Sequence, residues 1–155
     1  FGMDIYGYDP YLSDERFNSL GITRVASIEE MFSTVDFFSL HMPLTKETHH
    51  LINASTLSLM KPSTFFVNTS RGPLVNQKDL YQALVEKRIA GAALDVLEIE
   101  PPEAPFALAG LDNIILTPHA AFYSDESEIE LRRKAAQEIV RALTGNNPKN
   151  WVNKF

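Results

Sequence analysis

The sequence predicts an α/β fold built on a parallel sheet. Apolar segments rich in β-branched and aromatic residues alternate along the chain with segments that begin at helix-capping residues. Several strand segments are apolar almost throughout, which is typical of parallel strands covered on both faces. Most of the expected strands end at polar or ionisable residues. Because ligands bind beyond the carboxyl ends of such strands, this pattern predicts a functional site there.

Proline and residue type define the strands. Pro10, Pro43 and Pro118 each follow the end of an apolar run and stop it. The segment before Thr69 combines aromatic and β-branched residues, and the segment before Asp95 consists of small residues suited to close packing. Strands are expected at residues 3–9, 23–26, 35–41, 64–69, 89–96 and 113–117.

Capping residues define the helices. Ser13 and Asn76 are candidate N-caps, and Ser27 with Glu30 three residues later forms a capping-box pattern. Gly21 and Gly145 stand just past the ends of two apolar-periodic segments. Helices are expected at residues 13–20, 27–34, 54–60, 76–87 and 124–143, with residues 98–109 forming a proline-rich loop.

Composition excludes several classes of protein. A chain of 155 residues is long enough for one domain with its own core. The absence of cysteine excludes a disulfide framework and thiolate metal sites. The formal net charge of −6 is a poor match for nucleic acid or an anionic membrane. No apolar run approaches the length of a membrane span, and no signal peptide pattern opens the sequence.

Asp9 ends the first expected strand and precedes Pro10. In dinucleotide-binding folds, an acid at the end of the second strand accepts hydrogen bonds from the adenosine ribose, and a glycine fingerprint lies about 20 residues upstream. No G-x-G-x-x-G pattern occurs within the chain. Asp9 is therefore compatible with ribose binding and also with an ordinary turn.

Four further ionisable residues follow expected strands. His119 is suited to proton transfer near neutral pH, and a neighbouring carboxylate would fix its tautomer and favour the imidazolium. Glu100 and Asp95 follow the fifth strand and are candidates for such a carboxylate. Arg71 lies between a strand end and a glycine, and its guanidinium suits a substrate carboxylate. Taken singly, each is more often a structural or solvated side chain.

The remaining histidines carry less information. His49 and His50 are adjacent in a polar loop and are expected to be solvated, and His41 is expected to be packed. The four histidines show no spacing typical of metal ligands, so no metal site is predicted.

Taken together, these residues resemble the D-isomer-specific 2-hydroxyacid dehydrogenases, in order and spacing over nearly the whole chain. Residues 9–14, 49–53 and 119–124 look most similar to the C-terminal-binding-protein branch, although Phe122 stands where that branch carries tryptophan. The motifs that carry the family resemblance are residues 8–10, 41–45, 48–53, 67–72, 80–91, 92–96, 100–101 and 117–121.

The resemblance implies a Rossmann-type, doubly wound parallel sheet with NAD as its cofactor. His119 would be the general acid in 2-keto acid reduction, Glu100 its charged partner, and Arg71 the ligand of the substrate carboxylate. Cofactor contacts are implied for Asp9, Met42, Pro43, Thr48, Thr69, Ser70, Asp95, His119 and Ala121.

The resemblance also implies an incomplete domain. Residues 1–145 would be a partial NAD-binding domain beginning at its second strand, and residues 146–155 a tail returning toward an absent substrate domain. The first strand and glycine turn would be missing before Phe1. We therefore expect a gap or non-native pairing between residues 3–9 and 35–41, weak or no NAD binding, and no turnover by this chain alone.

The implied function is that of a fragment of a cytoplasmic, NAD-dependent oxidoreductase, homodimeric at full length. It would interconvert a small 2-keto acid and a D-2-hydroxy acid, without nucleic acid or membrane partners. Two alternatives stay open: an NAD-sensing transcriptional co-repressor of the C-terminal-binding-protein type, and a truncated fragment with no function of its own.

Overall fold

The computed structural model describes residues 1–151. The chain divides into two compact units, residues 1–119 and residues 120–155, which are described separately below. The domain boundary expected at residue 145 is a different division, and it stays a prediction. Of the expected C-terminal tail, residues 152–155 lie outside the described residues.

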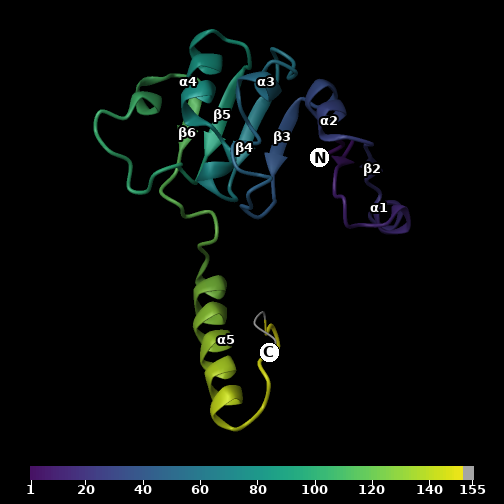
Figure 1. Ribbon diagram of the computed structural model, residues 1–155, viewed down its shortest axis with the longest axis vertical. Helices are drawn as coiled ribbons and strands as arrows, with labels where there is room; N and C mark the ends of the chain where they lie inside the picture. The colour runs from purple at the N-terminus through teal and green to yellow at the C-terminus, as the bar shows by residue number, and fades with distance from the viewer. Residues whose placement is uncertain (152–155) are drawn as a thin grey trace. The chain divides into compact units, whose positions relative to one another are not determined.

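The first unit contains a four-stranded parallel sheet in the order β3 (Phe37–Leu40), β4 (Phe65–Asn68), β5 (Gly91–Leu94) and β6 (Ile114–Leu116) (Figure 1). Leu40, Asn68, Leu94 and Leu116 pair in one row at the carboxyl ends of the strands. The predicted parallel α/β fold is confirmed. This register brings the segments that follow all four strands to one edge of the sheet.

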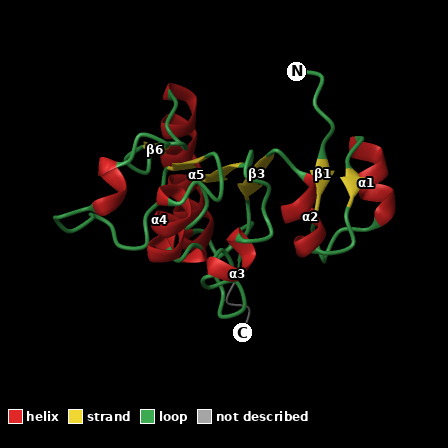
Figure 2. Cartoon of the chain, turned by 90° about the horizontal axis from the view of Figure 1, so that it is seen from above, coloured by secondary structure: helices red, strands yellow, loops and turns green. Residues whose placement is uncertain are grey.

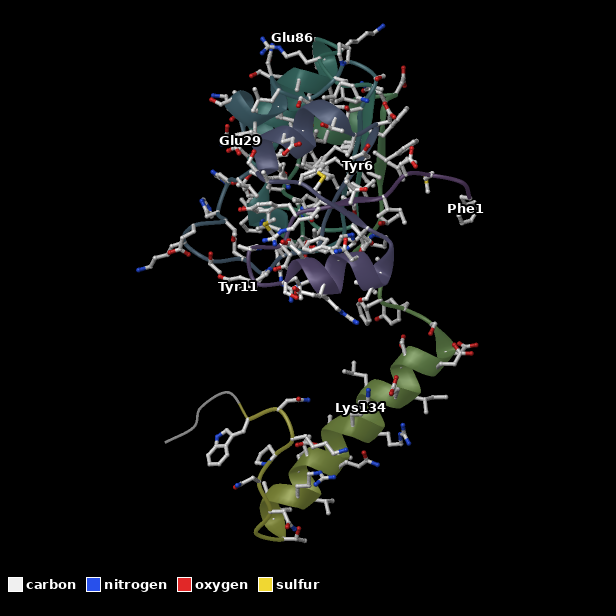
Figure 3. All side chains as sticks on the ribbon, turned by 90° about the vertical axis from the view of Figure 1, so that its right-hand side faces the viewer. Phe1, Tyr6, Tyr11, Glu29, Glu86 and Lys134 are labelled. Carbon is white, nitrogen blue, oxygen red and sulfur yellow. The ribbon has the colours of Figure 1, made fainter. Side chains whose placement is uncertain are left out.

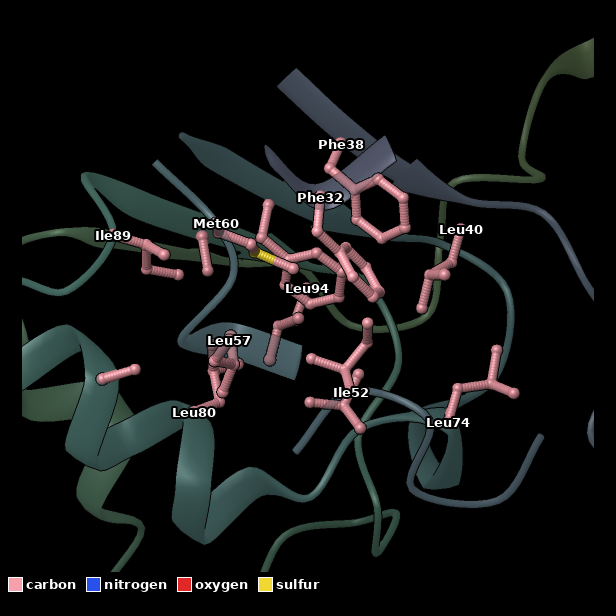
Figure 4. Close-up of a cluster of buried hydrophobic side chains, with 14 of the residues drawn as sticks. Phe32, Phe38, Leu40, Ile52, Leu57, Met60, Leu74, Leu80, Ile89 and Leu94 are labelled. Atoms are coloured by element: carbon pink, nitrogen blue, oxygen red, sulfur yellow. The ribbon is translucent and has the colours of Figure 1, made fainter. Parts of the chain in front are cut away.

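Three helices cover one face of this sheet and form the core with it. They are α2 (Ile28–Thr34), α3 (Ala54–Leu57) and α4 (Gln77–Val85). Figure 4 shows their apolar side chains meeting those of the strands. The largest side chains with almost no exposed surface are Phe32, Phe66, Leu40, Ile52, Leu57, Leu74, Leu80, Leu84, Ile89 and Leu94.

The opposite face of the sheet corrects the expectation that helices cover both faces. Phe37, Phe65 and Ile115 are 64%, 46% and 66% exposed, whereas their strand neighbours Phe38 and Phe66 are buried. Phe37 and Phe65 stack on each other with ring centroids 5.6 Å apart. Apolar residues on both faces of a strand indicate that both faces can be packed against helices. They do not show that this chain contains a helix for each face.

A second, two-stranded parallel sheet lies near the N-terminus. It consists of β1 (Tyr6–Gly7) and β2 (Thr23–Arg24), joined by α1 (Asp14–Leu20) (Figure 2). Within residues 1–151, β1 and β3 belong to different sheets and do not pair. The gap expected between the first and third strand segments is therefore present.

The helix caps follow the sequence closely. Ser13 and Gly21 flank α1, and Gly21 adopts the left-handed conformation with φ of 67°. The Ser27 side chain accepts a hydrogen bond from the Glu30 N–H, but the Glu30 carboxylate accepts from Ala26 N–H. The second half of the expected capping box is thus shifted by one residue.

The second unit contains the helix α5 (Asp125–Leu143), capped by Ser124 as expected. None of its residues is buried, including the apolar Ile129, Ile139 and Val140. Figure 3 shows side chains, among them Lys134, projecting from it along its length. Within the described part of the chain, no helix combines the length and apolar character that a membrane span needs.

Candidate active site

His119 follows β6 and is held in an unusual backbone conformation. Its φ of 54° lies in the left-handed region, which residues other than glycine rarely adopt. Its N–H donates to the carbonyl oxygens of Asp95, at 2.8 Å, and Thr117, at 3.1 Å. These bonds connect the segment after β6 to the segment after β5. Strained backbone of this kind gathers at functional sites when the surroundings fix it.

The His119 side chain pairs with Glu100. Its Nδ1 lies 2.8 Å from Glu100 Oε2, and the two side chains are 45% and 36% exposed. The other carboxylate oxygen of Glu100 accepts the Leu97 N–H at 2.7 Å. The hydrogen bond from His119, followed by that from Leu97, lowers the pKa of Glu100. Glu100 is thus held as a carboxylate, which orients the imidazole.

Asp95 is a buried carboxylate at the end of β5, only 5% exposed. Its Oδ1 accepts a hydrogen bond of 2.5 Å from the Thr117 hydroxyl, and its backbone N–H donates to Asn68 O. Burial of an acid is costly unless the acid is hydrogen-bonded, and the bond from Thr117 offsets part of that cost at Asp95.

Arg71 is positioned by Asn68, which the sequence analysis did not single out. Asn68 has no exposed surface, and its Nδ2 donates to Arg71 O while its Oδ1 accepts the Ser70 N–H. The Ser70 hydroxyl donates to Leu40 O at 2.6 Å. The Arg71 side chain is exposed and donates to Ser70 O. A polar amide at the end of an apolar strand was the signal that could have identified Asn68.

Gly72 brings the Arg71 turn against the loop that carries Glu100. A Cβ atom at Gly72 would overlap the Leu97 carbonyl group and Glu98 N. The turn η1 (Gly72–Leu74) therefore packs backbone to backbone on residues 97–98. Arg71 and Glu100 are each only a few residues from this contact.

The residues expected to contact the adenosine half of a dinucleotide lie on two segments. Asp9 Oδ1 accepts the Tyr11 N–H at 2.8 Å and so closes a turn after β1. In the loop after β3, the Thr48 hydroxyl donates to Pro43 O and accepts the Thr45 N–H. This loop is therefore ordered by its own threonines.

The other expected contact residues occupy different surroundings. Met42 packs against the core, whereas Thr69 is exposed. Ala121 belongs to the second unit, so its part in the site stays a prediction.

Two histidine expectations are wrong. His50 is not simply solvated, because its Nε2 lies 2.6 Å from Glu98 Oε1 and its side chain is only 30% exposed. His49 is exposed and stacks on the His50 ring. His41 is exposed rather than packed, and its Nε2 lies 3.0 Å from the Ser39 hydroxyl. Across residues 1–151, no group of three or more His, Cys, Asp or Glu residues could hold a metal ion.

The fold and this edge define a Rossmann-like α/β domain with a histidine–carboxylate pair beyond the ends of its parallel strands. A family model described as D-isomer specific 2-hydroxyacid dehydrogenase, NAD binding domain, matches residues 1–121. The chain belongs to this family.

Known relatives are similar over almost the whole chain. A D-3-phosphoglycerate dehydrogenase from Methanocaldococcus jannaschii is 42% identical over 153 residues, which are 99% of this chain and 29% of that protein. A glyoxylate reductase from Korarchaeum cryptofilum is 42% identical over 154 residues, 99% of this chain and 46% of that protein. The chain thus spans less than half the length of these relatives.

Solved structures agree with the family. The NAD complex of a D-isomer specific 2-hydroxyacid dehydrogenase from Lactobacillus delbrueckii ssp. bulgaricus superposes with a TM-score of 0.87 at 29% identity. The match covers 97% of this chain and 49% of that chain.

The chemistry of the described residues fits the two ends of NAD, the cofactor of this domain family. A carboxylate follows each of two strands, Asp9 after β1 and the buried Asp95 after β5, and carboxylates are groups that would accept hydrogen bonds from ribose hydroxyls or a carboxamide. The glycine fingerprint that usually binds the pyrophosphate does not occur within these 155 residues.

Proposed function

We propose that this chain supplies the catalytic edge of an NAD-dependent dehydrogenase that interconverts a 2-keto acid and a D-2-hydroxy acid. The observation that carries the proposal is the His119–Glu100 pair, 2.8 Å long, at the carboxyl ends of β5 and β6. The membership of the family supports it.

The proposed reaction assigns one task to each of three side chains. NAD supplies or accepts the hydride when it is bound. The imidazolium of His119 donates a proton to the developing alkoxide during reduction, and the neutral imidazole removes it during oxidation. Glu100 stabilises the imidazolium through Nδ1. Arg71 binds the substrate carboxylate and polarises the keto oxygen.

Cofactor-binding roles are proposed for residues that follow strands of both sheets. Asp95 binds the carboxamide, Thr69 and Ser70 line the nicotinamide side, and Asp9 binds the adenosine ribose. The loop with Met42, Pro43 and Thr48 covers the adenosine side, and His119 and Ala121 complete the set. The full-length protein is proposed to be a homodimer.

A segment exchange tests the function directly. This chain replaces the matched 154-residue segment in the Korarchaeum glyoxylate reductase, and NADH oxidation is followed with glyoxylate, hydroxypyruvate and larger 2-keto acids. We expect turnover, and a loss of roughly 10²–10⁴-fold in kcat for His119→Gln. His49→Gln is the matched control. An active chimera whose rate is unchanged by His119→Gln contradicts the acid–base assignment.

The 155-residue chain by itself is proposed to be inactive. The phosphate-binding glycine turn is missing from its sequence, and β1 does not pair with β3 within the described residues. Titration calorimetry with NADH should show no saturable binding, and saturable binding would refute this statement.

The co-repressor alternative gains no specific support. The relatives compared above are named as a dehydrogenase and a reductase, and none of the described contacts favours a regulatory role over a catalytic one. The resemblance to the C-terminal-binding-protein branch therefore stays a prediction.

A further inference from the structure

A second histidine–carboxylate pair uses the same loop as the first, because Glu98 and Glu100 are two residues apart. His50 and Glu98 are 48 residues apart in sequence, and their side chains are 30% and 31% exposed. His50 Nε2 donates to Glu98 Oε1 at 2.6 Å. None of the roles proposed above uses either residue.

Glu98 connects three segments of the chain. Its second carboxylate oxygen accepts the backbone N–H of Gln77, the first residue of α4, at 3.3 Å. This N–H belongs to the helix N-terminus, where a negative charge is favourable. Glu98 thus attaches its own loop to α4 and, through His50, to the segment before α3.

His50 is itself fixed through both of its backbone polar groups. Its N–H donates to Pro73 O at 2.9 Å, and its carbonyl oxygen accepts from Asn53 Nδ2, also at 2.9 Å. Asn53 is the N-cap of α3. The φ of His50 is 52°, a left-handed conformation that these bonds maintain. The imidazole therefore reaches Glu98 from a rigid base.

The Arg71 turn and the Glu100 loop both belong to this arrangement. Pro73, which binds His50 N–H, is two residues from Arg71. Glu98 is two residues from Glu100. Both lie in a turn over residues 97–100 that is closed by the hydrogen bond from Leu97 N–H to Glu100 Oε1. Gly72 packs on Leu97 between the two segments. Movement of Glu98 would therefore displace the acceptor of the Leu97 N–H.

We propose that His50 and Glu98 are positioning residues that hold the Glu100 loop against the Arg71 turn. This inference rests on the proposed function only for the roles of Glu100 and Arg71. Without the pair, the loop carrying Leu97 and Glu100 keeps its contact with Gly72 but loses its attachment to α4 and to His50.

The test uses the 155-residue chain and needs no cofactor. Glu98→Ala and His50→Ala are compared with wild type by NMR, following amide hydrogen exchange at Leu97 and the carboxyl titration of Glu100. We expect Leu97 exchange to accelerate about tenfold, as for loss of a hydrogen bond. The pKa of Glu100, which His119 and Leu97 lower and Asp95 raises, should move up toward its ordinary value.

Controls separate positioning from general destabilisation. Asp36→Asn removes the exposed Lys61–Asp36 pair at the amino ends of the strands and should leave both signals unchanged. His50→Gln, which keeps an N–H donor, should restore part of the Leu97 protection that His50→Ala loses.

Two outcomes overturn the proposal. One is Leu97 exchange within about twofold of wild type in both alanine variants, with the pKa of Glu100 unchanged from wild type. The other is an equal acceleration at Leu97 and at core amides of β4, which would indicate global unfolding. Failure of the proposed function is a separate result, because it appears as an inactive segment exchange while the Leu97 and Glu100 signals still respond.

Discussion

The two sheets of the first unit differ in how completely they are supported. The four-stranded sheet has one face sealed by three helices, with Phe66, Leu40 and Leu94 at most 1% exposed. The two-stranded sheet leaves Ile5 and Tyr6 exposed at 55% and 37%, and Phe17 of α1 is the buried side chain packed against it at Gly7.

The difference between the two sheets shows that the number of paired neighbours determines how long a strand is and how well the residues after it are held. Strand residues 3–9 were expected, but pairing extends over Tyr6–Gly7 alone, because β1 has a partner on one side and a short one. In the larger sheet, β4 and β5 are each paired on both sides. Accordingly, side chains at or after the strand ends of the larger sheet are hydrogen-bonded, as Asn68 is to Arg71 O and His119 is to Glu100. Asp9 after β1 makes one hydrogen bond, within its own turn.

The largest effect expected separates the two cores. Phe66→Ala should lower the free energy of unfolding by about 3–5 kcal/mol, since Phe66 has no exposed surface and stacks against Phe38. Phe17→Ala should instead release α1 and β2 locally. Urea unfolding monitored by far-UV CD measures the loss of global stability in Phe66→Ala. Amide hydrogen exchange over residues 5–26 measures the local opening in Phe17→Ala. Equal global losses would contradict two separate cores.

Glycine substitutions sharpen the same contrast. Gly72→Ala forces a Cβ into the Leu97 backbone and should cost about 3 kcal/mol. Gly7→Ala meets the ring edge of Phe17 and a methyl of Ile22, at 2.7 Å and 2.9 Å, which are side-chain atoms that can shift. It should cost about 1 kcal/mol. Chemical denaturation of the two variants gives the comparison, and a reversed order would mean that residues 97–98 yield easily.

Local sequence patterns predicted most of the fold. Capping residues located α1, α4 and α5 to within a residue at their starts, and the parallel sheet followed from apolar strands alternating with helices. The strands were expected too long, since hydrogen-bonding partners decide where a strand ends and a residue pattern does not. The open face of the sheet was missed for the same reason.

The candidate site was predictable only in part. His119, Glu100 and Arg71 were candidates because they follow strands, and the family resemblance supplied their roles, which stay predictions. The contact between His119 and Glu100 is present. The His50–Glu98 pair was missed, because contacts over 48 residues depend on the tertiary fold. Asn68 was missed because its function is to bind backbone atoms of Ser70 and Arg71.

The strand-end polar residues of the two sheets offer a smaller difference. Asn68→Ala leaves the Ser70 N–H and the Arg71 carbonyl without their side-chain partner in a partly buried position, so it should cost about 2 kcal/mol. Asp9→Ala loses one partly exposed turn bond and should change stability by less than about 0.5 kcal/mol. Thermal unfolding of both variants measures this. A larger loss for Asp9→Ala would show that the small sheet depends on its strand end.

The smallest expected effect is the change in the stability of the fold at acidic pH. The pKa of Glu100 is lowered by its hydrogen bonds from His119 and Leu97, and that of Glu15 in α1 by the Ser13 hydroxyl. A carboxyl group with a lowered folded-state pKa stabilises the fold above its unfolded pKa, near 4.5, and loses that contribution as pH falls through the folded value. Unfolding midpoints in urea should therefore converge progressively for wild type and Glu100→Gln as the pH falls below 4.5.

Glu15→Gln provides the matched comparison from the small sheet. Glu15 is exposed at the start of α1, so solvent screens its interactions and its substitution should alter the midpoint less at every pH. Glu100 also restrains residues 97–100 and His119, so its removal should shift the midpoint most above pH 4.5. If the two variants gave the same pH profile, the His119–Glu100 pair would contribute no more to the fold than a surface helix cap.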